Sequence, residues 1–325
     1  MTSPLHNETH KKWEGRIVNG KFPLHQYLGT TSGRAVFLTE FDGKKAVLKL
    51  VPVNSQTKDK LFLQWQRIAG ISHPNLLQMY ECGRCELNGA SLMLLYAVME
   101  YADVDLAHIL AERPITTAET QEMLKPLLEV LADVHSRGLV HAHLYPSNIM
   151  AVGDRIKIST DSLCTPEEFK AALISRKANV YDAPEIAQGE ISAASDVWSM
   201  GVTVIEALTL RQPVMATAEG LSADDLKKIQ PVQPEQIPPP FIDIVRNCLR
   251  LEPKTRWNIA EISTRLAFAN FMAHTPGIEH VATPEVVSEI ESTSQEIANA
   301  QQQPITPQQA QEALAPESIE PEREG

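Results

Sequence analysis

The sequence predicts an α+β fold with two lobes, a small β-rich lobe followed by a larger helical one. Residues 24–53 alternate apolar and polar positions between glycines, which is typical of short antiparallel strands. Beyond Asp105 the apolar positions recur with the period of a helix. A chain of 325 residues with 43% hydrophobic content is long enough to bury a substantial core.

The first lobe is expected to hold one helix among its strands. Residues 56–71 have helical spacing, and Trp65 lies on their apolar face. The helix should end before Pro74, because the residue preceding a proline is excluded from the helical region. Residues 76–81 and 92–101 are further strand candidates.

The second lobe is expected to be built from long apolar helices. Their predicted ranges are 117–137, 195–210, 241–249 and 259–268. We therefore divide the chain into an N-terminal segment (1–23), a first lobe (24–101), a second lobe (102–274) and a tail (275–325).

The tail is rich in Pro, Gln, Glu and Ser. From Pro276 to Gly325 there are ten Glu and one Arg, so this segment carries −9 of the net charge of −12. Its few apolar residues offer little burial to offset the entropy of ordering, and we expect residues 275–325 to be disordered. The rest of the chain is nearly neutral, which argues against nucleic-acid binding through a basic face.

Composition also restricts the compartment. The longest nearly uncharged apolar run, Leu92 to Met99, is far shorter than the roughly 20 residues of a membrane-spanning helix. Residues 1–15 lack the apolar segment of a signal peptide, so we expect no membrane segment and a cytoplasmic location.

The four cysteines do not suggest a disulfide scaffold. Cys82 and Cys85 form a single C-x-x-C, and a zinc site would need a second pair of ligands. We interpret Gly83-Arg84 between them as a turn joining two strands.

Three motifs in the second lobe follow one another at a characteristic spacing. They are Ala183-Pro184-Glu185, Asp196 to Val202, and Cys248 to Arg256. Over about residues 24–270 the chain resembles a eukaryotic-type, bacterial-like Ser/Thr protein kinase domain. The resemblance implies a bilobal kinase fold. It also implies a buried ion pair between Glu185 and Arg256, and an Asp196 that holds the backbone of the catalytic loop beginning at His141.

The resemblance places a nucleotide site in the first lobe. Leu28 to Val36 is similar to the Gly-rich loop, with two of its glycines at Gly29 and Gly33. A plain hairpin is the alternative interpretation. Lys49 occupies the position of the phosphate-contacting lysine, and the family's spacing gives it Gln64 as a partner in place of a glutamate.

The resemblance also implies where adenine would bind. Val36 and Val47 would sandwich the ring, and Val47 is larger than the family's usual alanine, which should weaken binding. Met99 is at the gatekeeper position, and Glu100 and Ala102 follow it in the hinge. Asp103 or Asp105 are either ribose contacts or surface residues; these alternatives stay open.

The catalytic positions depart from the kinase pattern together. His143 replaces the aspartate that acts as general base, and Tyr145 replaces the lysine two residues later. Without a gap, Thr160 falls on the metal-binding aspartate, and only Asn148, the second metal ligand, is retained. Further along, Ala178 replaces the activation-segment threonine. A general base contributes roughly 10²–10⁴ in rate, and the metal contributes several kcal/mol more.

Two substitutes for the lost groups remain open. A shifted loop could aim Asp161 at a magnesium ion, and His143, with a reference pKa near 6.5, could act as a base. We otherwise interpret His143 as a packing or hydrogen-bonding residue.

These features predict a pseudokinase. It would act as a signalling scaffold or regulator, binding unidentified protein partners and ATP without efficient phosphoryl transfer and with little use of Mg²⁺. The alternative is a divergent active Ser/Thr protein kinase that transfers the γ-phosphate of ATP. A third hypothesis assigns partner binding to the acidic tail.

Overall fold

A computed structural model describes residues 10–31, 34–53, 58–87, 93–172, 179–211 and 237–274. The chain divides into two units, Met1–Ala269 and Asn270–Gly325. The elements below belong to the first unit, except for the end of the last helix. The predicted disorder of residues 275–325 concerns a segment outside the described residues.

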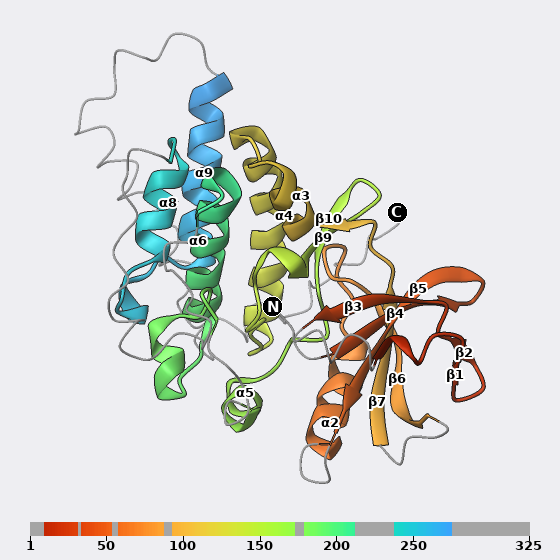
Figure 1. Cartoon of the computed structure of the whole chain (residues 1–325). Coiled ribbons are helices and arrows are strands. Elements are labelled where there is room, and N and C mark those ends of the chain that lie inside the picture. Colours follow the sequence, from red (N-terminus) through yellow and green to blue (C-terminus); the bar gives the residue numbers. More distant parts are fainter. Residues whose placement is uncertain are drawn as a thin grey trace, which may run out of the picture. The chain divides into compact units, whose positions relative to one another are not determined.

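A five-stranded antiparallel sheet forms the first lobe (Figure 1). Its strand order is β3 (Gln26–Thr31), β4 (Arg34–Phe41), β5 (Lys44–Pro52), β7 (Met93–Glu100) and β6 (Met79–Glu86). Helix α2 (Lys58–Ala69) packs against β6 and β7. The β-rich lobe with helix α2 among its strands is thus as the sequence predicts.

The N-terminal segment belongs to this lobe. A short ribbon of β1 (Ile17–Val18) and β2 (Phe22–Pro23) carries Val18 and Phe22 into the same core as Phe37 of β4. Trp13 is also buried there. The boundary that we predict at residue 24 therefore falls inside a hydrophobic core. Periodicity could not reveal this, because a two-residue strand is too short to show a period.

The interpretation of Cys82-Gly83-Arg84-Cys85 as a turn is wrong, because these residues lie inside β6 and pair with β7. A side chain at Gly83 would overlap the ring of Tyr96, since a Cβ built there lies 2.6 Å from that ring. The glycine thus makes room for a neighbouring aromatic. No group of three or more metal-ligating side chains occurs among the described residues.

The second lobe is helical and is centred on α4 and α6 (Figure 1). Its helices are α3 (Leu106–Glu112), α4 (Thr117–Ser136), α5 (Pro166–Ala172), α6 (Ala193–Thr209), α8 (Phe241–Cys248) and α9 (Ile259–His274). Short 3-10 turns occur at η1 (Pro146–Asn148), η3 (Pro184–Gln188) and η5 (Pro253–Thr255). Thr116 caps α4 in a capping box with Glu119, which fixes where that helix begins.

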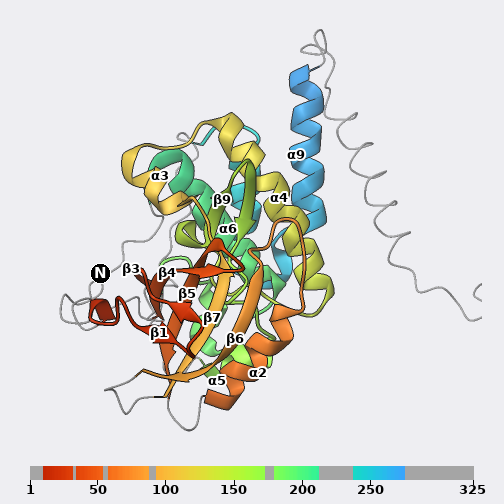
Figure 2. The ribbon, with the colours of Figure 1, turned by 90° about the vertical axis from the view of Figure 1, so that its right-hand side faces the viewer.

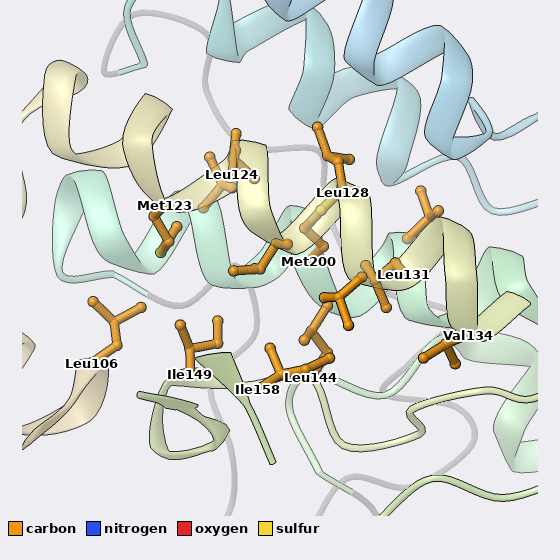
Figure 3. Packing of buried hydrophobic residues seen from close by; sticks show 14 of the residues in the cluster. Leu106, Met123, Leu124, Leu128, Leu131, Val134, Leu144, Ile149, Ile158 and Met200 are labelled. Carbon is orange, nitrogen blue, oxygen red and sulfur yellow. The ribbon is translucent and has the colours of Figure 1, made fainter. Parts of the chain in front are cut away.

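One face of α4 organises the core of this lobe. Leu124, Leu128 and Leu131 are almost fully buried and belong to the same hydrophobic cluster as Leu144 and Ile158, part of which Figure 3 shows. Burying one such side chain stabilises the fold by about 1.5–3 kcal/mol. The segment around Leu144 is therefore packed in the same core as α4.

A small sheet of β8 (Val104–Asp105), β9 (Ile149–Val152) and β10 (Arg155–Ile158) completes the second lobe. It lies beside α3 and α4, as Figure 2 shows for α3 and β9. Ile158 at the end of β10 hydrogen-bonds to Asn75, and Leu77 hydrogen-bonds to Ile158. This pairing brings the residues after β10 next to the first lobe. No described helix has the length and apolar character needed to cross a membrane.

Candidate functional site

Lys49 lies near the middle of the five-stranded sheet. It is on β5, with Val36 of β4 opposite on one side and Ala97 of β7 on the other. Its side chain is 7% exposed. A buried ammonium persists only when it is paired, so its partners define the site.

The partner of Lys49 is Asp161. The Nζ atom of Lys49 donates to Oδ1 of Asp161 at 2.7 Å, with the hydroxyl of Ser159 further away at 3.4 Å. Arg34, at the start of β4, donates to the other carboxylate oxygen of Asp161. Ser159 also donates to Oδ1. The Asp161 carboxylate is therefore held between two cations and a hydroxyl.

Burial alone would raise the pKa of Asp161, whose side chain is only 2% exposed. The charges of Lys49 and Arg34 outweigh that effect, and the pKa of Asp161 lies well below its usual range. Asp161 is thus an anion at any physiological pH.

Gln64 does not contact Lys49, which corrects our expectation. Its amide donates to the backbone oxygen of Leu163 at 2.8 Å. The reason is electrostatic, because a neutral amide cannot compete with the Asp161 carboxylate for an ammonium. Beside it on α2, the indole of Trp65 donates to the backbone oxygen of Asp161 at 3.2 Å. Helix α2 therefore fixes the segment after β10 instead of fixing Lys49.

Thr160 does not face the site, although an ungapped comparison with the kinase motif puts it at the metal position. Its hydroxyl donates to the backbone oxygen of Leu77, and the residue is fully buried. The next residue, Asp161, turns toward Lys49 instead. The chain bends at Thr160 and turns at Asp161, and the N–H of Leu163 donates to the backbone oxygen of Thr160, so the two neighbouring side chains point in different directions.

The residues present do not fit a magnesium ion. Mg²⁺ needs free oxygen ligands in octahedral geometry. Both oxygens of Asp161 are engaged by Arg34 and Lys49, and the Thr160 hydroxyl is directed at Leu77. The amide of Asn148 donates to the backbone oxygen of His143 at 2.8 Å, which leaves one amide oxygen as a ligand.

The catalytic loop is held by Asp196, which is fully buried on α6. Its carboxylate accepts hydrogen bonds from the backbone nitrogens of His141 at 2.7 Å and Ala142 at 2.8 Å. His135 contacts the same carboxylate at 2.9 Å. These contacts hold Ala142 at a φ of 63°, a left-handed conformation that is strained for alanine.

His141 is a buried structural residue of that loop. Burial lowers the pKa of His141, so the ring is neutral. Because a carbonyl oxygen can only accept, the Nε2 atom carries the proton and donates to the backbone oxygen of Ser159 at 2.8 Å. This bond ties the catalytic loop to the segment that carries Asp161.

His143, at the position of the general base, packs among aromatic side chains. Its ring meets Tyr145 edge-on with 5.9 Å between centroids, and Tyr145 stacks on Tyr181 at 5.5 Å. The hydroxyl of Tyr181 donates to Glu206. Aromatic contacts of this kind are consistent with the packing role that we predict for His143.

The residues that the resemblance assigns to adenine lie on the strands around Lys49 and at the end of β7. Leu28 is 46% exposed, and Val36 and Val47 are half-buried. Met99 is buried at the end of β7, and the backbone N–H of Ala102 donates no hydrogen bond to the described residues. Small-molecule sites are typically apolar with a few polar groups, and these residues have that character.

The loop that precedes Arg34 is only partly described. Gly29 has a φ of 130°, which is accessible almost exclusively to glycine, and it follows an irregularity in the pairing of β3 with β4. Gly33 and Ala178 lie outside the described residues.

The acidic residues near the hinge have structural partners. Asp103 accepts from the backbone of Gly153, and Asp105 caps α3 by accepting from His108. Glu100 accepts from Lys157 and from the backbone of Gln78. The surface interpretation of Asp103 and Asp105 therefore agrees better with these contacts than a ribose contact does.

Comparison with known proteins identifies the fold family. Residues 25–266 match the protein kinase domain. The chain belongs to the protein kinase family. It is 27% identical over 268 residues to the probable serine/threonine-protein kinase SCO3848 of Streptomyces coelicolor, covering 76% of this chain and 39% of that protein.

Other relatives are also serine/threonine kinases. Identity is 27% over 210 residues to serine/threonine-protein kinase PknB of Mycolicibacterium smegmatis, covering 60% of this chain and 33% of that protein. Identity is 25% over 242 residues to serine/threonine-protein kinase cds1 of Schizosaccharomyces pombe, covering 70% of this chain and 51% of that protein. The chain therefore spans about half or less of the length of these relatives.

The kinase domain has its buried ion pair in place. Arg256 donates to both carboxylate oxygens of Glu185, at 2.6 and 2.8 Å. Ser195 donates to the same carboxylate at 2.7 Å, and the guanidinium lies 4.9 Å from the ring centroid of Trp198. Such a pair is tolerated in the interior because the remaining hydrogen bonds are also satisfied.

Sequence reasoning missed two residues that contact Asp161. Arg34 was assigned only to the loop motif, and Ser159 was given no role. The contact between Arg34 and Asp161 joins residues 127 positions apart, and no local pattern reports such a contact. An arginine in the strand next to Lys49 was the one available signal.

Proposed function

We propose that this kinase domain is a pseudokinase. It would act in the cytoplasm as a regulator or scaffold that binds protein partners and ATP without efficient phosphoryl transfer. The observation that supports the proposal most directly is the engagement of both Asp161 carboxylate oxygens by Arg34 and Lys49. Asp161 is the one acidic side chain that the described structure brings to Lys49, and both of its carboxylate oxygens are engaged in ion pairs.

The catalytic loop supports the same proposal. His143 stands where an active kinase carries an aspartate, and it packs against Tyr145 instead of being held as a free base. Losing a general base costs roughly 10²–10⁴ in rate, and losing the metal costs several kcal/mol more of transition-state stabilisation. Turnover should therefore fall orders of magnitude below that of an active kinase.

ATP binding is supported by the residues that remain. Lys49 provides a cation, and the face formed by Leu28, Val36 and Val47 provides apolar contacts. The bound nucleotide would contribute the phosphates, while the chain's own residues orient the base.

The four cysteines are all free thiols, which agrees with a reducing compartment.

Phosphate incorporation tests this proposal. The purified chain would be incubated with ATP and either Mg²⁺ or Mn²⁺, and phosphorylation would be measured by intact-protein mass spectrometry. Lys49→Ala is the matched control. We expect no incorporation above that control, with or without a generic protein substrate such as casein.

One observation favours the alternative of a divergent active kinase. Asp161, instead of Thr160, carries its carboxylate to Lys49, so an acidic group is within reach of a bound nucleotide. Metal-dependent incorporation that disappears in both Lys49→Ala and Asp161→Asn would establish this alternative and contradict the pseudokinase.

A further inference from the structure

The group around Asp161 carries more positive than negative charge. Lys49 and Arg34 are both cations, and Asp161 is the carboxylate that they share. Within the described structure, their other contacts are to neutral groups, namely the hydroxyl of Ser159, the backbone oxygen of Asp161 and the ring of Trp65. An uncompensated cation in a site of low exposure is costly, so an anion that entered would be stabilised.

Both cations have N–H groups that donate to no described residue. Arg34 uses its Nη1 atom for Asp161, and its Nε and Nη2 atoms donate to no described group. Lys49 has one short bond, to Asp161, and one long one to Ser159. The side chain of Arg34 is 18% exposed, so it is largely desolvated but still reachable. Guanidinium groups with free N–H donors recognise phosphate oxygens in pairs.

The strand geometry directs both cations to one face of the sheet. Ala35 and Phe37 are buried in the core on the other face, so Arg34 and Val36 point the opposite way. Lys49 lies directly across from Val36, and its side chain therefore shares this face. This is the face on which Leu28, Val36 and Val47 offer apolar surface to an adenine ring.

A divalent cation does not fit here, as the engagement of Asp161 and the position of Thr160 show. The negative charge of a nucleotide's phosphates would then need another source of neutralisation. Arg34 is a permanent cation and supplies it without a metal.

We propose that Arg34 is a second phosphate-binding residue, which replaces the metal ion and lets this site take a nucleoside diphosphate or triphosphate without Mg²⁺. This inference rests on the proposed function, which includes nucleotide binding. It adds the residue responsible and the metal independence of the complex.

Isothermal titration of the full chain with ATP and with adenosine, in EDTA and in Mg²⁺, tests the proposal. The wild type should bind ATP in EDTA. Arg34→Gln should weaken ATP binding by about 10- to 100-fold and leave adenosine binding unchanged, because adenosine has no phosphate. Arg34→Lys keeps the charge but loses the paired N–H donors of the guanidinium. Its affinity for ATP should lie between those of the wild type and Arg34→Gln.

Lys44→Gln is the matched control, since it removes an exposed cation from the same sheet without touching the site. Thermal unfolding would be followed for each variant, and Arg34→Lys carries the test if Arg34→Gln does not fold. Arg34 has no such role if wild-type ATP binding requires Mg²⁺ or is absent in EDTA. The same conclusion follows if Arg34→Gln changes ATP and adenosine binding equally or changes neither. A wild type that needs Mg²⁺ to bind but transfers no phosphate would reject this inference and leave the pseudokinase standing.

Discussion

Asp161→Asn should destabilise the first unit strongly, because it leaves the buried Lys49 and the partly buried Arg34 without their shared anion. The Asp161 side chain is 2% exposed, and it is bonded to Lys49 at 2.7 Å and to Arg34. Removing one partner of a buried ion pair costs about 3–5 kcal/mol. Asparagine keeps one acceptor oxygen, so the lower end, about 3 kcal/mol, is the expected loss of unfolding free energy.

Urea and thermal unfolding at pH 7 measure this loss. For a domain of this size it corresponds to a fall of about 6–12 °C in Tm. Asp154→Asn, at an exposed position in the turn between β9 and β10, is the matched control and should stay within about 0.5 kcal/mol of the wild type.

The stability difference should also depend on pH. Because the pKa of Asp161 is lowered in the folded state, its contribution is fully present above the unfolded pKa of about 3.9. It is lost as the pH falls below that value toward the folded pKa. The wild type and Asp161→Asn should therefore converge only in acid. A loss below about 1 kcal/mol at pH 7, or a difference that does not shrink between pH 4 and pH 3, would refute the reasoning.

Three further predictions concern the second lobe. Arg256→Ala should cost about 3–5 kcal/mol in unfolding free energy, since it leaves the buried carboxylate of Glu185 unpaired. Gly201→Ala should cost about 1–3 kcal/mol, because a Cβ there would lie 2.7 Å from Cβ of Cys248, whereas Gly70→Ala meets only ordinary contacts and serves as the control. Burial raises the pKa of Cys248 to about 12, so its thiol should not react with Ellman's reagent at pH 8 until the chain unfolds.

The first two are measured by urea unfolding. An Arg256→Ala variant as stable as the wild type would mean that the ion pair with Glu185 contributes nothing to the free energy of unfolding. Equal effects at Gly201 and Gly70 would contradict the steric argument. Rapid labelling of Cys248 in the native protein, mapped by peptide mass spectrometry, would contradict its burial.

The fold was accessible from the sequence because its main signals are local. Alternation over 24–53 and helical spacing over 117–137 depend on near neighbours. The strands β3, β4 and β5 and the helix α4 occur within a few residues of these predicted bounds. The resemblance to protein kinases implied the contact between Glu185 and Arg256, and the two side chains meet in the structure. The ribbon that carries Val18 was missed because its strands are too short to show a period.

The site was less accessible because it depends on one residue of register. Whether Thr160 or Asp161 faces Lys49 is decided by how the chain leaves β10. Ungapped motif spacing places Thr160 at the metal position, and it left the shifted-loop alternative with Asp161 open. Gln64 was assigned to Lys49 for a similar reason. Spacing located Gln64 on α2. That the carboxylate of Asp161, far away in the sequence, takes its place beside Lys49 can be seen only in the three-dimensional structure.

Phosphorus NMR of stoichiometric protein and ATP measures binding and turnover together, and so tests the central claim most directly. The pseudokinase account predicts broadened ATP resonances in EDTA, no change of the β- and γ-phosphate signals over hours after Mg²⁺ is added, and loss of the broadening in Lys49→Ala. A Mg²⁺-dependent decay of the γ-phosphate signal with growth of ADP and a phosphoprotein resonance, absent in Lys49→Ala, would contradict it.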